Sequence, residues 1–211
     1  MTGEKKQRAI RGYVLAGGAS SRFGSDKAFA VLGGQTLLAR MCGLIESVAG
    51  NMSVVAAAGR YLDFIAPTVP DRWPGEGPLG GILTALGATQ AGGHAGELNL
   101  IVSCDMPFLT REWLGYLVEQ ALVSDAEVIV VKSERGLEPL CTCWRASALG
   151  ILQDAFDQGV RKVTEAMKRL RMEVLDETHW KRFDSAGRLF WNMNTPRDYE
   201  EAVRIWGTEH E

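Results

Sequence analysis

Histidine is scarce in this sequence, and the few histidines present are scattered. The chain of 211 residues contains three of them, His94, His179 and His210. A histidine-based metal site needs ligands at suitable spacings, and a catalytic triad needs a histidine that activates a nucleophile. Neither arrangement has support here, so chemistry that depends on histidine is not expected.

Cysteine is also rare, with four residues in the chain. The spacing of Cys42, Cys104, Cys141 and Cys143 fits neither paired CxxC zinc knuckles nor the disulfide framework of a secreted domain. Cys141 and Cys143 form a CxC pair, and on a strand both side chains would face the same side of the sheet. We therefore predict that the cysteines are buried, reduced thiols.

Long apolar runs and an excess of either charge are absent as well. Nothing approaches a run of about 18 apolar residues, so the sequence predicts no transmembrane helix. Residues 1–8 are polar and charged, lack the apolar core of a signal peptide, and are expected to form a flexible tail. The formal net charge of -3 indicates neither a nucleic-acid partner nor a membrane partner. These features favour a protein of the cytoplasm, and we expect a monomer or weak oligomer.

What the sequence does have is the pattern of an ordinary α/β domain. Hydrophobic residues make up 46% of the chain and charged residues 23%, which is enough to bury a full core. Short apolar runs alternate with segments of helical spacing, and Thr195 with Pro196 marks the start of a last helix. Strands are expected at residues 10–15, 52–58, 98–103 and 127–131, and helices at residues 37–48, 80–89, 110–117, 146–156, 160–170 and 196–205.

This alternation predicts a mostly parallel sheet with helices on both faces. Right-handed crossovers then give a Rossmann-like three-layer sandwich, formed by a single domain over residues 1–211. Ligands of such sheets bind in the crevice beyond the carboxyl ends of the strands. Two of the expected strand ends carry unusual residues.

The first expected strand runs into a glycine-rich turn. Gly17 and Gly18 let backbone N–H groups approach a phosphate closely, because no Cβ intervenes. Ser20 adds a hydroxyl donor, Arg22 a planar guanidinium and Lys27 a mobile charge, all suited to phosphate oxygens. The spacing matches neither a P-loop nor GxGxxG. The residue types favour a phosphate site over a plain turn between strand and helix.

The third expected strand is followed directly by Asp105. A carboxylate beside a phosphate-binding loop repels the ligand unless a cation lies between them. Mg²⁺ meets this need, because it binds one or two carboxylates together with phosphate oxygens. The alternative is that Asp105 caps a turn before Pro107.

Residues 15–27, LAGGASSRFGSDK, resemble the LAGGxSxRxGxDK signature of the molybdenum cofactor guanylyltransferase family, a group of Rossmann-like nucleotidyltransferases. The further motifs of that family follow in its order: Asp71, GPLGG at 77–81, CDMPFL at 104–109, EPLC at 138–141, GVRKV at 159–163, and NMNTP at 192–196 with Asp198. The first motif alone is shared with several nucleotidyltransferases, whereas this ordered set of motifs, from residue 10 to about residue 202, is much more specific to the family.

The resemblance implies a reaction in which GMP passes from GTP to molybdopterin and pyrophosphate is released. The terminal phosphate of the pterin would attack the α-phosphorus, so no covalent enzyme intermediate is needed. By the same resemblance, Arg22 and Lys27 would neutralise the pyrophosphate, Asp105 would hold Mg²⁺, and Asp71 would contact guanine or ribose. The implied substrate-binding residues are Leu15, Ala16, Gly17, Gly18, Ser20, Asp71, Gly77, Pro78, Leu79, Asn192 and Asn194.

Some roles stay open at this point. Asn192 and Asn194 either border the site or simply build a turn. Arg161 and Lys162 either meet the pterin phosphate or lie on a solvated helix face. The family often carries an Asn just after the second strand, where this chain has Ala56-Ala57-Ala58-Gly59, so base recognition is expected to differ in detail.

Four functions remain in competition. GMP transfer is favoured by the form of the first loop and of Gly77-Pro78-Leu79. The rivals are cytidylyl transfer to the same pterin, nucleotidyl transfer to a sugar or polyol phosphate, and a non-enzymatic nucleotide-binding adaptor. The expected substrates are GTP and molybdopterin, with transient contacts to proteins that deliver the cofactor or to apo-molybdoenzymes.

Overall fold

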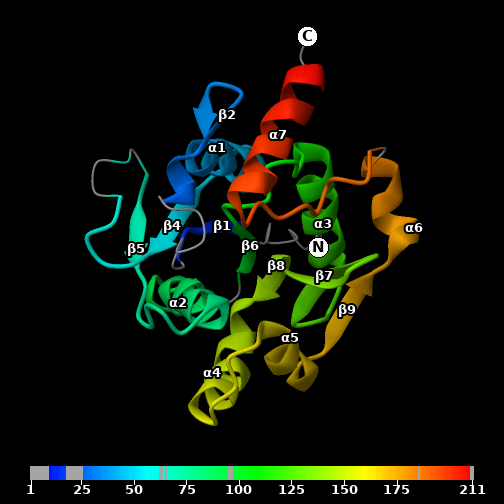
Figure 1. Ribbon diagram of the computed structural model, residues 1–211. Coiled ribbons are helices and arrows are strands. Elements are labelled where there is room, and N and C mark those ends of the chain that lie inside the picture. The colour runs from blue at the N-terminus through cyan, green and yellow to red at the C-terminus, as the bar shows by residue number, and fades with distance from the viewer. Residues whose placement is uncertain are drawn as a thin grey trace, which may run out of the picture.

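The computed structural model describes residues 10–17, 26–61, 64, 66–94, 97–184 and 186–209. A seven-stranded sheet crosses the middle of the molecule, and helices lie on both sides of it (Figure 1). The tail expected at residues 1–8 lies outside the described residues. The strands of the sheet are β1 (Ile10–Leu15), β4 (Met52–Ala56), β5 (Thr68–Pro70), β6 (Leu98–Ser103), β7 (Val128–Ser133), β8 (Gly136–Arg145) and β9 (Met172–Leu175), and a separate hairpin is formed by β2 (Val31–Leu32) and β3 (Gln35–Thr36).

The helices of the described residues include short single turns as well as longer elements. The α-helices are α1 (Leu37–Ala49), α2 (Pro78–Ala91), α3 (Arg111–Val123), α4 (Leu149–Asp157), α5 (Val163–Ala166), α6 (Glu177–Trp180) and α7 (Pro196–Glu209). The 3-10 turns are η1 (Lys27–Phe29), η2 (Ala146–Ala148), η3 (Met167–Arg169) and η4 (Lys181–Phe183). None of these helices has the length and apolarity that crossing a bilayer requires.

The strands lie in the order β5-β4-β1-β6-β8-β7-β9. β8 pairs antiparallel with β6 and β7, and the other strand pairs are parallel. The mostly parallel Rossmann-like sandwich predicted from the sequence is therefore confirmed. The sequence analysis assigned no strand to residues 136–145, where the structure has β8. The first half of β8 contains Pro139 and is only partly buried, so its sequence lacks the apolar pattern of a strand.

Two expected elements are shorter in the structure than predicted. β4 ends at Ala56 rather than at residue 58, because the chain turns there and the Arg60 N–H donates to the Ala57 carbonyl at 3.0 Å. The helix expected at 160–170 is reduced to α5 and η3, because Lys162 and Leu170 have extended backbone on either side of them. Thr110 caps α3, since its hydroxyl accepts the Trp113 N–H at 3.2 Å.

The sheet separates two apolar layers. Side chains of α1, α3 and α6 pack on one face of the sheet, and side chains of α2, α4 and α5 pack on the other (Figure 1). Successive residues of β1 point to opposite layers, with Val14 in the first layer and Tyr13 and Leu15 in the second. The central strand β6 is buried along its whole length, as expected for a parallel strand covered on both faces.

Gly12 allows a close approach of α1 to β1. A Cβ at this position would lie 2.2 Å from Ile45 Cγ2 and 2.7 Å from the Asn51 carbonyl oxygen. Both distances are far below van der Waals contact, so only glycine fits without movement of α1. The tight approach fixes how α1 lies over the strand that carries the glycine-rich turn.

Gly12→Ala should lower the free energy of unfolding by about 1–3 kcal/mol, the usual cost of overpacking a core. Gly43→Ala is the matched control, because Gly43 is exposed on α1 and a Cβ there would meet nothing within 4 Å. Gly43→Ala should raise the free energy of unfolding by about 0.5–1 kcal/mol, since alanine favours the helix more than glycine does. Urea unfolding measures both, and a Gly12→Ala protein as stable as the parent would contradict the close approach.

Candidate active site

Three parallel strands end together at one edge of the sheet. Leu15 of β1 is paired with Val55 of β4 on one side and with Ser103 of β6 on the other. The pairing continues beyond the strands, since Ala16 N–H donates to the Val55 carbonyl at 2.9 Å and Cys104 N–H donates to the Leu15 carbonyl at 3.2 Å. The start of the glycine-rich turn is thus held firmly. Gly18, Ser20 and Arg22, all predicted here, lie outside the described residues.

Lys27 and Asp105 meet above this edge. The Lys27 ammonium donates to Asp105 Oδ2 at 2.5 Å, and the two side chains are 20% and 9% exposed. Asp105 Oδ1 is buried and has no hydrogen-bond partner among the described residues. The carboxylate was expected to need a cation beside it, and in the structure the Lys27 ammonium supplies that charge. A carboxylate that caps a turn accepts a backbone N–H. The Asp105 side chain accepts none within the described residues.

Asp71 follows β5 and faces Gly17 across the same edge. Its Oδ1 accepts the Trp73 N–H at 3.0 Å and lies 3.0 Å from the buried Thr84 hydroxyl. Its Oδ2 lies 3.8 Å from the position that a Cβ on Gly17 would take. One carboxylate oxygen is therefore anchored by the protein, and the other is directed toward the glycine-rich turn.

The N-terminus of α2 completes this wall. Gly77 has φ 84° and ψ -177°, a conformation that favours glycine, and Pro78 is the first helical residue. Gly77 makes no side-chain cap, so a ligand can approach the first turn of the helix. The side chain of Leu79 is fully buried in the core, so any contact between this residue and a ligand would be through its backbone.

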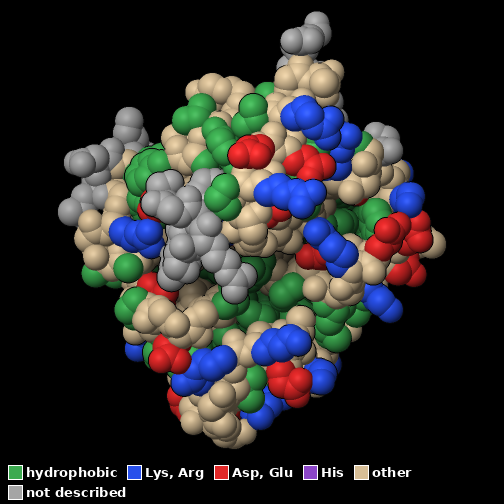
Figure 2. Space-filling view, viewed as in Figure 1, with side chains coloured by type: hydrophobic (Ala, Val, Ile, Leu, Met, Phe, Trp, Pro, Cys, Tyr) green, Lys and Arg blue, Asp and Glu red, His purple; other side chains and the backbone are tan. Residues whose placement is uncertain are grey.

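A cleft of about 300 Å³ joins these residues. Figure 2 shows that this face of the molecule is hollowed near its centre and that hydrophobic side chains line the hollow. The cleft combines an apolar floor with a few charged groups, as ligand sites commonly do. It is lined by the predicted residues Leu15, Gly17, Lys27, Asp71, Gly77, Pro78 and Asp105, together with Val55, Gly75, Gly81, Ser103 and Leu140.

The C-terminal segment 192–196 reaches the cleft through Asn194. Asn194 Oδ1 lies 3.4 Å from the Lys27 ammonium, and Met193 N–H donates to the Asp105 backbone carbonyl at 2.8 Å. Asp198 then caps the start of α7, because its Oδ2 accepts the Asn194 and Thr195 N–H groups, both at 2.8 Å. Asn192 instead donates to the Phe190 carbonyl at 3.2 Å within its own turn. The two asparagines therefore differ, and only Asn194 contacts Lys27.

Arg161 does not line the cleft, and its charge is paired within the protein. Its guanidinium pairs with Glu76 at 2.5 Å and lies 3.9 Å from the centre of the Phe156 ring. Trp73 also packs against Phe156, with ring centres 5.4 Å apart. These contacts attach the loop between Asp71 and Gly77 to α4. Lys162 is exposed just before α5.

The sequence analysis missed a polar cluster behind the glycine-rich turn. Asp26 Oδ2 accepts the Tyr61 hydroxyl at 2.9 Å and the Arg60 guanidinium at 2.8 Å. Asp26 directly precedes Lys27 in the SDK end of the first motif, which is a signal that could have drawn attention to it. Arg60 and Tyr61 lie in an aperiodic turn after β4, and no pattern in the sequence marks them.

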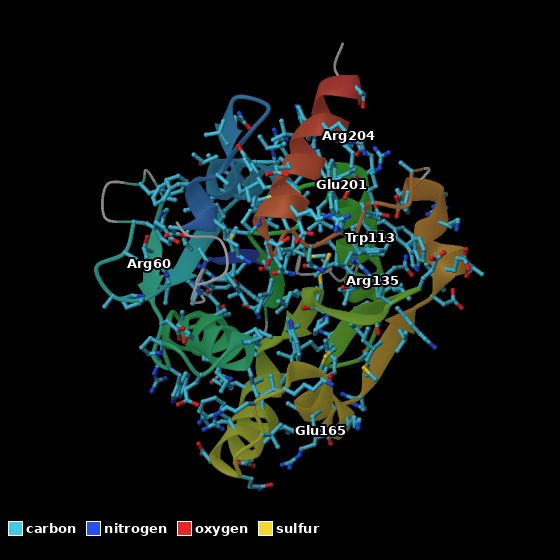
Figure 3. All side chains as sticks on the ribbon, viewed as in Figure 1. Arg60, Trp113, Arg135, Glu165, Glu201 and Arg204 are labelled. Carbon is cyan, nitrogen blue, oxygen red and sulfur yellow. The ribbon has the colours of Figure 1, made fainter. Side chains whose placement is uncertain are left out.

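A second cavity, of about 320 Å³, lies between the β7–β8 turn and α7. Arg135 from the turn and Glu201 from α7 both line it, and Figure 3 labels them on the right of the view. Arg135 also donates to the Phe190 carbonyl. Because Phe190 and Trp191 line this cavity and Asn194 contacts Lys27, the segment 190–194 separates the two cavities.

The four cysteines are free and buried, as predicted. Cys141 and Cys143 both belong to the layer under α1 and α3, which confirms that they face the same side of the sheet. Burial, followed by the neighbouring Asp105 charge, raises the pKa of the Cys104 thiol to about 12. Burial also raises the pKa of Cys42 and of Cys141 to about 12. None of these thiols is prepared to act as a nucleophile near neutral pH.

Comparison with known proteins assigns the chain to a family. Residues 12–172 match the MobA-like NTP transferase domain. A molybdenum cofactor guanylyltransferase of Desulfosudis oleivorans is 31% identical and aligns over 92% of this chain and 94% of its own length. A relative in Chloroflexus aggregans, named a probable molybdenum cofactor guanylyltransferase, is 32% identical over 94% of this chain and 96% of its own.

A solved structure agrees with these relatives. The molybdopterin-guanine dinucleotide biosynthesis protein A of Archaeoglobus fulgidus superposes with a TM-score of 0.80 at 25% identity, over 94% of this chain and 99% of that one. The fold is that of a Rossmann-like nucleotidyltransferase. Within that class, the chain belongs to the MobA-like NTP transferase domain family.

The thiols provide a direct test of the packing around the cleft. In native protein at pH 8, none of the four cysteines should react with Ellman's reagent within minutes, because each is buried with a raised pKa. All four should react after unfolding in guanidinium chloride. Rapid reaction of one thiol in the native protein would show that a cysteine is exposed and would contradict the structure.

Proposed function

We propose that this protein transfers GMP from GTP to molybdopterin, forming molybdopterin guanine dinucleotide and pyrophosphate. The observation that carries the proposal is the meeting of Lys27, Asp71 and Asp105 in one cleft at the strand ends. Relatives of the same length that bear the name molybdenum cofactor guanylyltransferase support the choice of substrates. The reaction would take place in the cytoplasm, in a monomer or weak oligomer that meets cofactor-delivering proteins or apo-molybdoenzymes transiently.

The chemistry requires positioning and charge rather than a protein nucleophile. An oxygen of the pterin phosphate forms a bond to the α-phosphorus of GTP, and the bond from that phosphorus to the bridging oxygen of pyrophosphate breaks. Lys27, at the end of the glycine-rich turn, would neutralise charge on the leaving pyrophosphate, with Arg22 as its partner. The backbone of Leu15, Ala16 and Gly17, with Gly18 and Ser20, would hold the nucleotide in place.

Asp105 fits the role of a Mg²⁺ ligand. Its Oδ2 is bound to Lys27, while its buried Oδ1 lacks a hydrogen-bond partner among the described residues, so one oxygen is left for a cation. Those residues contain no group of three or more His, Cys, Asp or Glu side chains that could hold an ion by themselves. Mg²⁺ needs no such group, because it retains waters and binds phosphate oxygens. When bound it would polarise the α-phosphorus.

Asp71 and the N-terminus of α2 would recognise the nucleoside. The free oxygen of Asp71 is a suitable acceptor for the N–H groups of guanine, and it could equally bind ribose hydroxyls. Gly77 and Pro78, with the backbone of Leu79, would form the wall beside it, where the positive end of the helix favours an anion. Asn194 would contact the reacting phosphates beside Lys27, and Asn192 would support its turn.

Nucleotide choice distinguishes the competing functions. With Mg²⁺ and molybdopterin, labelled GTP should give the dinucleotide product at least about 100-fold faster than labelled CTP, because a site that pairs the polar edge of guanine leaves its own groups unmatched with cytosine. Equal or faster use of CTP would establish a cytidylyltransferase instead. Product formed only with a sugar or polyol phosphate would support the third function, and binding without turnover would support an adaptor.

Asp105→Asn tests the metal site. Asparagine keeps one oxygen but lacks the negative charge that Mg²⁺ and Lys27 require, and we expect turnover to fall about 100-fold or more. The affinity for GTP should also lose its dependence on Mg²⁺. Titration of GTP with and without Mg²⁺ measures this, beside turnover and a melting curve.

Asp184→Asn is the matched control for this change. Asp184 is 8% exposed and lies outside the cleft, and the asparagine keeps an oxygen for the Arg188 N–H, which is 2.7 Å away. This variant should bind Mg²⁺ and GTP as the parent does. Full activity of Asp105→Asn, or a loss shared by both variants, would show that Asp105 has a structural role.

A further inference from the structure

We infer that Tyr61 and Arg60 are positioning residues for Lys27, because they hold Asp26 at the end of the glycine-rich turn. This inference rests on the proposed function, because the turn is taken to bind the pyrophosphate part of GTP. Neither residue belongs to the motifs that suggested the function, and neither lines the cleft. Both would act at a distance, through the geometry of the turn.

The Tyr61 hydroxyl contacts both ends of the turn. It lies 2.9 Å from Asp26 Oδ2, to which it donates, and 3.2 Å from the Ala16 carbonyl oxygen. Ala16 precedes the undescribed residues 18–25 by two positions, and Asp26 directly follows them. The buried Tyr61 hydroxyl thus joins Ala16, just after β1, to Asp26, just before η1.

Arg60 strengthens the contact with Asp26. Its guanidinium donates to the same oxygen, Asp26 Oδ2, at 2.8 Å, and it lies 5.5 Å from the centre of the Tyr61 ring. Asp26 Oδ1 accepts the Ala28 N–H at 3.2 Å and so caps η1, the 3-10 turn whose first residue is Lys27. Figure 3 shows Arg60 on the left of the molecule, on the side of β4 and β5.

The same contacts determine where Lys27 lies. Asp26 fixes the backbone at the start of η1, and the Lys27 ammonium then reaches Asp105 at 2.5 Å. If Asp26 were released, η1 would lose its cap and Lys27 would lose its fixed origin. The two residues behind the turn therefore act on the ammonium group that would neutralise pyrophosphate.

The backbone of Tyr61 supports a role beyond simple packing. Tyr61 has φ 60°, and it is the only residue other than glycine with a positive φ among those described. Such a conformation is unfavourable for a side chain with a Cβ, and it persists where surrounding contacts over-determine it, often at functional sites. Burial, followed by the hydrogen bond to Asp26, raises the pKa of the Tyr61 phenol, so the hydroxyl stays protonated and can donate.

Two tyrosines and two arginines provide matched variants. Tyr13 is also buried, and its hydroxyl lies 2.9 Å from Thr89 Oγ1 in the other layer, so Tyr13→Phe removes a comparable hydroxyl away from the turn. Arg11 pairs with Glu97 at 2.7 Å, so Arg11→Gln matches Arg60→Gln. A loss of pyrophosphate binding in only the Tyr61 or Arg60 variant of a pair reports on the turn. A loss shared by both variants of a pair reports on general stability.

The first measurement is calorimetric titration with inorganic pyrophosphate and Mg²⁺, a probe that needs neither the base nor the pterin. Tyr61→Phe and Arg60→Gln should each weaken binding about fivefold or more, the scale of one lost hydrogen bond or ion pair. Tyr13→Phe and Arg11→Gln should bind as the parent does. If the parent fails to bind pyrophosphate, both this inference and the proposed function are overturned.

The second measurement follows Lys27 itself. Acetylation by a water-soluble succinimidyl ester, read by peptide mass spectrometry, should be slow at Lys27 and fast at Lys168, whose side chain is 67% exposed. Tyr61→Phe should speed acetylation of Lys27 about threefold or more, because local opening becomes easier. Tyr13→Phe should leave the Lys27 rate unchanged.

These measurements separate failure of the inference from failure of the function. If the parent binds pyrophosphate while Tyr61→Phe matches it in both affinity and Lys27 acetylation, the positioning role is excluded and the proposed function still stands. An equal effect of Tyr13→Phe would also exclude the positioning role, because it would trace the loss to general destabilisation.

Discussion

Three parallel strands, β4, β1 and β6, are held in register by their hydrogen-bond ladders, and the remaining features of the cleft depend on that register. Because the strands run the same way, Val55, Leu15 and Ser103 end side by side. The turns that leave those ends then face one another, which brings Asp105 within reach of Lys27 although 78 residues separate them in sequence. A slip of one residue would turn these side chains to the opposite face.

The electrostatics of the cleft follow from limited exposure to water. Lys27 and Asp105 attract each other more strongly there than at an open surface, since the local dielectric constant is lower. Each also remains accessible enough to exchange partners with a charged ligand, with exposures of 20% and 9%. Lys27 and Asp105 compensate each other's charge, and Asp71 adds a further carboxylate to the cleft.

Much of this arrangement could be predicted from the sequence, because it depends on local patterns. Asp105 lies just beyond the apolar strand β6, and Lys27 ends the glycine-rich motif that follows β1. The parallel sheet predicted from periodicity places such residues together. The rest depends on contacts that periodicity does not encode. Arg161 pairs with Glu76 at the surface, and Asn192 bonds within its own turn. Tyr61 was missed because a left-handed residue in an irregular turn leaves no recurring signal.

The link between segment 192–196 and the sheet has a consequence for biosynthesis. Met193 donates to the Asp105 carbonyl, and Asn194 lies beside the Lys27 ammonium. The ribosome makes the chain from its N-terminus, so β1, β4 and β6 emerge long before these last partners exist. A nascent chain can thus assemble the sheet while the surroundings of Lys27 and Asp105 are still unfinished. The surroundings of Lys27 and Asp105 are therefore completed only after segment 192–196 has been synthesised.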